Sequence, residues 1–228
     1  MYALHDSMHK FFLSHQQTLL AARNGVLATT SAKSSLHSCM ACGFSTARTK
    51  RVGTHNGSFD CDEALACFMI CLTNKFYGAQ IVHTKDPLVL EALDAVVDVG
   101  SVYDPSRDLY DHHHKEFEEI FGHGFTTKLS SAGLVYKHYG VEIIAKELQL
   151  DQGHPNVNRL FLAAIDAVDN GINQYATDES PRYVNNTSLP SRVGRLNLDG
   201  VDTDQSSEKE DEAFQHAMTL AGSEFLEV

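Results

Sequence analysis

Short apolar runs alternate with longer helical patterns from Arg51 onward, and this alternation predicts the elements of the body of the chain. Runs of branched and small apolar residues predict strands ending near His55, at 79–83 and at 95–99. Apolar residues at helical spacing predict helices over 62–75, 86–93, 130–148, 156–168 and 210–226. Strands that alternate with helices imply right-handed crossovers and a parallel sheet. We therefore expect an α/β fold, a parallel-sheet domain with flanking helices.

Polar residues follow two of the predicted strands. His55 comes after the first strand, and Asp60 and Asp62 lie in the loop that enters the next helix. Asp98 closes the third strand, and the run Asp111-His112-His113-His114 follows about a dozen positions later. Sheets of this type bind ligands at the carboxyl ends of their strands, so we expect these side chains to meet there.

Two further acids, Asp166 and Asp169, lie three residues apart at the end of a predicted helix and face the same way. Imidazoles and carboxylates together are the ligands of a dinuclear site for hard or borderline divalent metals. Two such ions lie about 4 Å apart and need a bridging carboxylate, for which Asp98 on the central strand is the natural candidate. The sequence thus predicts a metal-dependent hydrolase, in which a nearby histidine protonates the leaving oxygen.

Each of these residues also has an ordinary interpretation. A single histidine such as His55 is more often a plain loop residue, and a tandem histidine run is sometimes only solvated. Asp166 and Asp169 could be simple helix-end acids, although acids at a helix C-terminus are electrostatically unfavourable. Ser130 or Ser131 is a candidate cap for the helix over 130–148. The ordered combination of His and Asp clusters is what favours a metal site.

Charge is distributed unevenly along the 228 residues. The first 52 contain six Lys or Arg and a single acid, Asp6, whereas the whole chain has a net charge of -12. An acid-poor, Ser-rich segment is typical of an organellar transit peptide, so we expect residues 1–50 to be a disordered, transit-like extension and 51–228 a hydrolase domain. The acidic body argues against nucleic-acid capture by a broad basic face, although bound ions could still attract a phosphate. No apolar run approaches the length of a membrane span.

Several short motifs stand out beyond residue 51. They are HNGSF at 55–59, CDEALA at 61–66, VDVG at 97–100, YDHH at 110–113, TKLSSAGL at 127–134 and DAVDNGI at 166–172, followed by RY at 182–183 and SRVGRLN at 191–197. In combination they resemble the melanocyte-proliferating-gene family, over about residue 51 to the C-terminus. That family is grouped with the Asp-His-His phosphoesterases, so the resemblance implies a fold of that type.

The resemblance also implies metal ligands and an activity. By analogy with the superfamily, one metal would be held by His55, Asp60 and Asp98. The other would be held by Asp62, Asp98, His112 and either Asp169 or Asp166, with Asp169 favoured. His113 would act near the leaving group, and Asp98 would be central to catalysis. The implied activity is that of a 3′–5′ RNA exonuclease using two Mn²⁺ or Mg²⁺ ions. The implied location is mitochondrial or nuclear (nucleolar); a cytoplasmic location is the remaining alternative.

This chain departs from the family pattern in two ways. Asp60 stands where the usual pattern has histidine, which implies a preference for harder metals. The family chain normally continues for about another hundred residues, so the C-terminal domain that helps to bind substrate is expected to be truncated. Candidate substrate contacts are Lys128, Arg182, Arg192 and Arg195. The three arginines suit phosphate but could equally be solvated loop cations.

Two other functions remain open. One is a pyrophosphatase-like enzyme that hydrolyses small phosphate compounds. The other is a truncated, non-catalytic protein that binds metal, or binds a partner through its exposed final helix. A homo-oligomer is also possible, because a lost domain interface would leave an apolar patch that promotes association.

Overall fold

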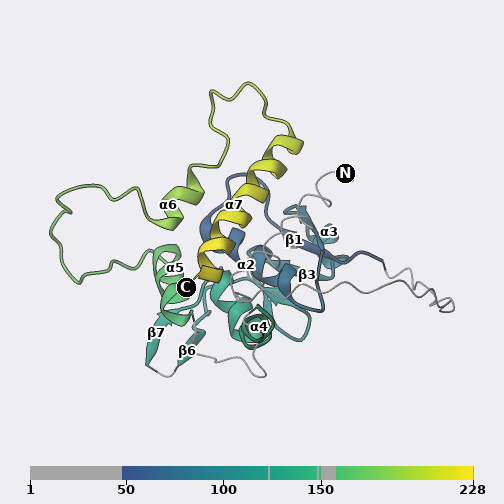
Figure 1. The fold of residues 1–228 in the computed structure, drawn as a ribbon, viewed down its shortest axis with the longest axis horizontal. Coiled ribbons are helices and arrows are strands. Elements are labelled where there is room, and N and C mark those ends of the chain that lie inside the picture. Colours follow the sequence, from purple (N-terminus) through teal and green to yellow (C-terminus); the bar gives the residue numbers. More distant parts are fainter. Residues whose placement is uncertain (1–47, 123, 148, 150–157, 228) are drawn as a thin grey trace, which may run out of the picture. The chain divides into compact units, whose positions relative to one another are not determined.

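The computed structural model describes residues 48–122, 124–147, 149 and 158–227 (Figure 1). The chain divides into two units, Met1–Thr49 and Lys50–Val228, and the fold described below is that of the second unit. The transit-like segment predicted from the sequence lies almost entirely outside the described residues. No helix in the described ranges is long and apolar enough to cross a membrane.

A mainly parallel sheet forms one layer of this unit. Five strands are arranged in the order β2-β1-β3-β5-β4. Their bounds are Arg51–Thr54 (β1), Gln80–His83 (β2), Ala95–Val97 (β3), Tyr103–Asp104 (β4) and Leu109–Tyr110 (β5). Strands β2, β1, β3 and β5 are parallel, whereas β4 pairs antiparallel with β5 at the edge. The predicted parallel sheet is confirmed. A separate two-stranded hairpin is formed by β6 (Ile120–Gly122) and β7 (Phe125–Lys128).

The described residues form six helices around these strands. Their bounds are Cys61–Leu72 (α2), Pro87–Glu91 (α3), Ser131–Glu147 (α4), Arg159–Asp169 (α5), Leu189–Gly194 (α6) and Ser207–Glu227 (α7). All five predicted helices are present. The last one begins at Ser207, three residues earlier than predicted. Sequence patterns did not predict β4, β5, the β6–β7 hairpin or α6.

Helix α2 lies at the centre of the core. All twelve of its residues are buried, and it packs against both α4 and α7 (Figure 1). The contact with α7 is close at Gly222, where an added Cβ would come within 2.4 Å of the Phe68 ring. Burial on every side fixes the position of α2, and therefore of the acids in its first turn.

Local sequence explains where the helices begin. Asp60 caps α2 by accepting a hydrogen bond from the Glu63 amide, and Asp62 and Glu63 in the first turn suit the positive end of the helix dipole. Asp86 caps α3 in the same way, with Pro87 in its first turn as predicted.

Candidate metal centre

The candidate site lies where the three central strands end. His55 directly follows β1, Asp98 follows β3, and the Asp-His-His run follows β5. Because these strands are parallel and adjacent, their carboxyl ends meet at one edge, as the sequence predicted. Asp98 has a left-handed backbone conformation, with φ of 58°, and its amide donates to the carbonyl of Tyr110. The turn after β3 therefore points this carboxylate into the site.

One group of possible ligands consists of His55, Glu63 and Asp98. Nε2 of His55 lies 3.0 Å from Oε2 of Glu63 and 3.5 Å from Oδ2 of Asp98. The other Glu63 oxygen accepts a 2.5 Å hydrogen bond from the Thr54 hydroxyl at the end of β1. Glu63 was not among the predicted site residues.

A second group consists of Asp62, His112 and Asp169. Nε2 of His112 lies 3.2 Å from Oδ2 of Asp169 and 3.5 Å from Oδ1 of Asp98. Asp98 thus lies between the two groups and has contacts to a histidine of each. This is the position expected of a bridging carboxylate.

His113 lies at the more open side of the site and is held by Asp111. Its Nδ1 is 2.8 Å from Asp111 Oδ1 and 3.6 Å from Asp98 Oδ1, and its side chain is 57% exposed. Asp111 also accepts bonds from the backbone amides of Ser101 and His113, and these fix its position. The Asp111 contact raises the pKa of His113 to about 9, so this imidazole is protonated at neutral pH in the metal-free chain. Asp98, His112 and His113 together form a further possible ligand group.

The first residues of α4 bind three site carboxylates. Ser130 donates to Asp166 from both its amide and its hydroxyl. The amide of Ser131 donates to Asp62, and its hydroxyl donates to Asp98 over 2.8 Å. As predicted, Ser130 lies at the start of the helix, where its carbonyl accepts a hydrogen bond from the Leu134 amide, but the hydroxyls of both serines donate to acids from other segments. Carboxylates at a helix N-terminus are favoured by the free amides and by the dipole.

Asp60 and Asp166 differ in position from the other predicted ligands. Asp60 is exposed, caps α2, and can share a cation with Asp62 and Asp98. Among the described residues, the group that contains His55 includes Glu63 rather than Asp60. Asp166 is buried and joins none of the groups found there; it holds the start of α4. Of the two alternatives, Asp169 is the one placed beside His112.

Negative charge is concentrated in this site, and the pKa values reflect it. Burial, together with the neighbouring Asp98, Asp60 and Asp169, raises the pKa of Asp62 well above its ordinary value. Burial also raises the pKa of Asp169. For Asp98, burial is outweighed by hydrogen bonds from histidines and a serine, and its pKa is lowered. Contacts to Asp98 and Glu63 raise the pKa of His55 to about 10. Such crowded carboxylates need positive charge nearby.

The donor atoms fit a divalent cation. Four of them are buried and form no hydrogen bond, namely Asp62 Oδ1, Glu63 Oε2, His112 Nε2 and Asp169 Oδ2; the last three have only the histidine–carboxylate contacts of 3.0 and 3.2 Å given above. A buried polar atom without a partner is costly, and all four belong to the groups described above. A cation between them would satisfy these atoms and offset the charge. The residues present therefore match the hard and borderline ligands of a divalent metal.

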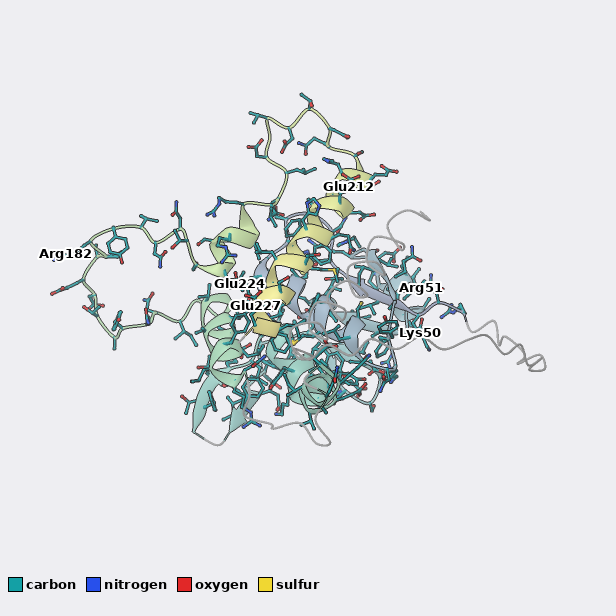
Figure 2. All side chains as sticks on the ribbon, in the orientation of Figure 1. Lys50, Arg51, Arg182, Glu212, Glu224 and Glu227 are labelled. Atoms are coloured by element: carbon teal, nitrogen blue, oxygen red, sulfur yellow. The ribbon has the colours of Figure 1, made fainter. Side chains whose placement is uncertain are left out.

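The four predicted substrate contacts are not gathered at the site. Arg192 pairs with Glu224 of α7 at 2.6 Å, and Arg195 donates to the carbonyl of Asn186. Arg182 is exposed on the long segment between α5 and α6 (Figure 2). Lys128, at the end of β7, lies over the ring of Phe117, which in turn contacts the ring of His112. Of the four, Lys128 is the one linked to the histidine run by side-chain contacts, through the ring of Phe117.

Other residues that shape the site carried little signal in the sequence. Asn197 accepts from the amide of Phe59 and donates to its carbonyl, each at 2.8 Å, and so holds the loop before Asp60. Asn170 similarly bonds the carbonyls of Lys128 and Asp166. Both asparagines belong to the motifs noted above. The motifs alone do not indicate which backbone groups the asparagine side chains will hydrogen-bond.

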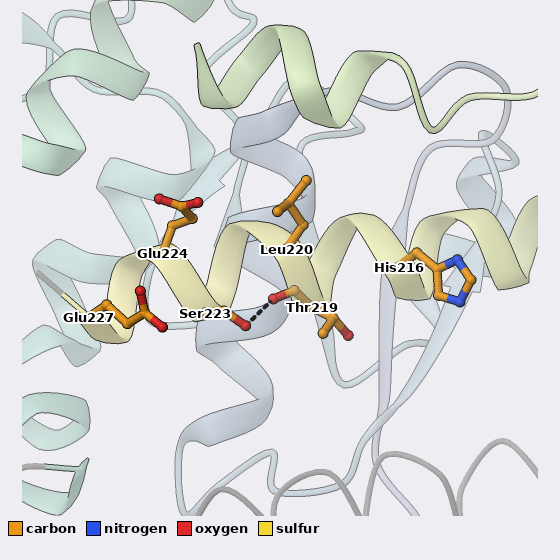
Figure 3. A pocket seen from close by; sticks show the side chains of 6 residues that line it. All are labelled: His216, Thr219, Leu220, Ser223, Glu224 and Glu227. Carbon is orange, nitrogen blue, oxygen red and sulfur yellow. Dashed lines mark hydrogen bonds between the residues drawn. The ribbon is translucent and has the colours of Figure 1, made fainter. Parts of the chain in front are cut away.

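A hollow of about 410 Å³ lies on the outer face of α7 (Figure 3). It is lined by His216, Thr219, Leu220, Ser223, Glu224 and Glu227. None of these residues belongs to the ligand groups found among the described residues. The hollow is therefore separate from the candidate metal centre.

Together, the fold and the site define an α/β protein with a buried histidine–carboxylate centre of the kind that holds divalent cations. Comparison with known proteins makes this more specific. The MYG1 exonuclease family model, described as "Uncharacterised protein family (UPF0160)", matches residues 51–228, and the chain belongs to this family. The resemblance drawn from the motifs is thus confirmed.

Curated relatives agree with this assignment. The human "MYG1 exonuclease" is 45% identical over 189 residues, covering 78% of this chain and 49% of the relative. The Caenorhabditis elegans "MYG1 protein C27H6.8" is 42% identical, with 78% and 54% covered, and the Saccharomyces cerevisiae "MYG1 protein YER156C" is 37% identical, with 78% and 56% covered. The chain spans about half the length of the curated relatives it matches. No solved structure matches the chain.

Proposed function

We propose that this chain is a metal-dependent phosphodiesterase of the Asp-His-His type that removes nucleotides from the 3′ end of RNA. One observation carries the proposal: buried donor atoms from three segments, at Asp62 and Glu63, at His112 and at Asp169, converge around the shared carboxylate of Asp98. The naming of the human relative as an exonuclease supports a nuclease-like hydrolase. The ligand groups suit two ions, for which Mn²⁺ or Mg²⁺ fits the oxygen-rich donor set.

Asp98, His113 and Lys128 have different roles in the proposed reaction. Bound divalent ions would neutralise phosphoryl oxygens and make a water molecule more acidic. Asp98 lies 3.5 Å from His55 of one ligand group and 3.5 Å from His112 of the other, so it is placed to bridge the two groups. His113, whose Nδ1 is occupied by Asp111, presents its protonated ring at the open side and can give a proton to the leaving oxygen. Lys128 is the candidate to bind an outgoing phosphate near the histidine run.

Release of mononucleotides from 3′-labelled single-stranded RNA in the presence of Mn²⁺ tests this function. The wild-type chain should release them, and Asp98→Asn and His112→Ala should not. Unchanged release by either variant would contradict the role of the site. Parallel assays with pyrophosphate and with single-stranded DNA separate the RNA exonuclease from the small-phosphate hydrolase and from a DNA-directed enzyme. Metal binding without any turnover would favour the non-catalytic alternative.

The location and assembly of the protein are also proposals. We propose a mitochondrial location, directed by residues 1–50, with a nuclear or nucleolar pool. Fluorescence microscopy of the chain fused to a reporter at its C-terminus, with and without these residues, tests this directly. Mitochondrial signal that persists after their removal would contradict it. Sedimentation analysis of the purified chain tests the proposed homo-oligomer.

A further inference from the structure

Glu63 is buried completely, yet one of its carboxylate oxygens has no hydrogen-bond partner. The side chain projects from the first turn of α2, and Thr54 holds its Oε1 through a 2.5 Å hydrogen bond. That bond directs Oε2 toward Nε2 of His55, 3.0 Å away. Isolating a carboxylate from water costs several kcal/mol unless a partner compensates it. The site therefore contains a fixed, buried carboxylate oxygen that faces the Nε2 of His55.

The distances match those between ligands of one ion. Oxygen and nitrogen ligands bind Mg²⁺ and similar ions at about 2.1 Å, so two neighbours at right angles lie about 3 Å apart. Glu63 Oε2 and His55 Nε2 are 3.0 Å apart, and Nε2 is 3.5 Å from Asp98 Oδ2. His55 turns its other nitrogen, Nδ1, toward the carbonyl of Asn56 at 3.4 Å. Nε2 is thus the nitrogen that faces both carboxylates.

We infer that Glu63 is a ligand of the ion held by His55 and Asp98. This inference rests on the metal-dependent function proposed above and adds a residue to it. Asp60, which the superfamily analogy assigned to this ion, is exposed and already occupied in capping α2. Glu63 is rigidly placed from two sides, by the buried helix and by Thr54. Glu63 is therefore a better candidate than Asp60 for the third ligand of this ion.

The overall charge supports this assignment. The ligand groups found among the described residues contain five carboxylates, those of Asp60, Asp62, Glu63, Asp98 and Asp169. Metal ligation requires ionised carboxylates and neutral histidines. In that state a single divalent ion would leave three negative charges close together in a largely buried site, whereas two ions nearly balance the five charges. Glu63 thus supplies the charge that a second ion requires, in addition to a donor atom.

The experiment is titration of the metal-free chain with Mn²⁺, followed by calorimetry and by electron paramagnetic resonance of the unbound ion. Glu63→Gln keeps the shape of the side chain and an oxygen that can accept from Thr54, but removes the anionic donor. One of the two Mn²⁺ equivalents should bind at least tenfold more weakly in Glu63→Gln, and Asp60→Asn should cause a smaller loss. The matched control Glu91→Gln, which removes an exposed acid in α3, should bind as wild type does.

A double variant separates ligation from a structural role. If Glu63 and His55 share an ion, His55→Ala and Glu63→Gln should weaken the same equivalent, and combining them should add little further loss. Independent, additive losses would overturn the inference, as would wild-type binding by Glu63→Gln. If Glu63→Gln does not fold, Glu63→Asp takes its place, and it should show the same selective weakening because its oxygen is withdrawn by one methylene. Normal binding by Glu63→Asp would then overturn the inference.

These outcomes are independent of the RNA assay. Selective loss of one Mn²⁺ equivalent in a chain that releases no nucleotide would uphold Glu63 as a ligand and contradict the exonuclease. Nucleotide release that requires Asp98, together with normal Mn²⁺ binding by Glu63→Gln, would uphold the exonuclease and contradict the ligand.

Discussion

The hydroxyl of Ser131, in the first turn of α4, donates a 2.8 Å hydrogen bond to Oδ1 of Asp98, which follows β3. This bond ties a helix start to the carboxylate shared by the ligand groups. Ser131→Ala should remove it and leave a buried carboxylate oxygen with less support, at a cost of about 1–3 kcal/mol in unfolding free energy. Mn²⁺ affinity should fall with it, because Asp98 becomes free to turn. Denaturant unfolding and calorimetry measure both effects; full Mn²⁺ affinity would show that the bond is not needed for orientation.

Divalent metal should stabilise the folded chain. An ion that binds only the folded state adds about 2.7 kcal/mol at a free concentration one hundred times its dissociation constant. The melting temperature should therefore rise with Mn²⁺ and return to its starting value with a chelator. Asp98→Asn is a fair test of specificity, because asparagine tolerates the left-handed backbone found at this position, where φ is 58°. That variant should lose most of the shift while remaining folded.

The metal-free chain should lose stability as pH rises toward neutrality. Burial raises the pKa of Asp166 to about 7 from its ordinary 3.8, against the opposing hydrogen bonds from Ser130. Because the folded-state pKa lies above the unfolded value, the stabilising contribution is complete at low pH and is lost as pH rises through about 7. Unfolding free energy, measured with a chelator from about pH 5 to about pH 8, should decline. Asp166→Asn should flatten part of this decline, and an unchanged slope would contradict the assignment.

Gly222 is a point of close approach between α7 and α2. A Cβ at this position would come within 2.4 Å of the Phe68 ring, which is 2% exposed and has little room to move. Gly222→Ala should therefore destabilise the chain by about 1–3 kcal/mol through overpacking. Gly194→Ala is the matched control, since a Cβ there meets nothing within 4 Å. Thermal unfolding distinguishes the two; equal melting temperatures would show that the helices shift apart at little cost.

Asn197 should matter for metal binding despite its distance in sequence from every ligand. Its amide group bonds both backbone atoms of Phe59, next to Asp60. Asn197→Ala should release this loop and weaken Mn²⁺ binding several-fold, with a loss of about 1–3 kcal/mol for two unsatisfied backbone groups. Asn185→Ala, in the exposed segment before α6, serves as the comparison and should leave Mn²⁺ binding unchanged.

Sequence patterns predicted the parallel strands and the longer helices because the apolar residues that these elements bury recur at regular spacing along the chain. Residues 95–97 are wholly apolar and buried, and Phe214, Met218 and Phe225, which recur at helical spacing within 210–226, are buried as well. Strands of two residues, such as β4 and β5, are too short to show any period. They form because Tyr103 and Asp104 pair with Tyr110 and Leu109, and no local pattern encodes that pairing.

The ligand inventory was largely predictable, but the way in which the ligands are grouped was not. Asp62 and Glu63 are neighbours in the chain, and successive helical residues point about 100° apart. Asp62 therefore joins His112 and Asp169, whereas Glu63 joins His55 and Asp98. Glu63 was not among the predicted site residues, because its approach to His55 depends on how α2 packs in the folded chain. Similarly, serines suited to capping α4 instead bind carboxylates from distant segments.

The donor atoms of the centre come from widely separated stretches of the chain, from His55 after β1 to Asp169 at the end of α5. No single stretch supplies a complete group, because each group combines residues that follow different strands or helices. During synthesis on the ribosome, the second ligand group cannot form until Asp169 has left the exit tunnel. The second ligand group should therefore be completed late in synthesis, well after the residues of the first group, and a prematurely terminated product ending before α5 would lack Asp169 and could not complete it.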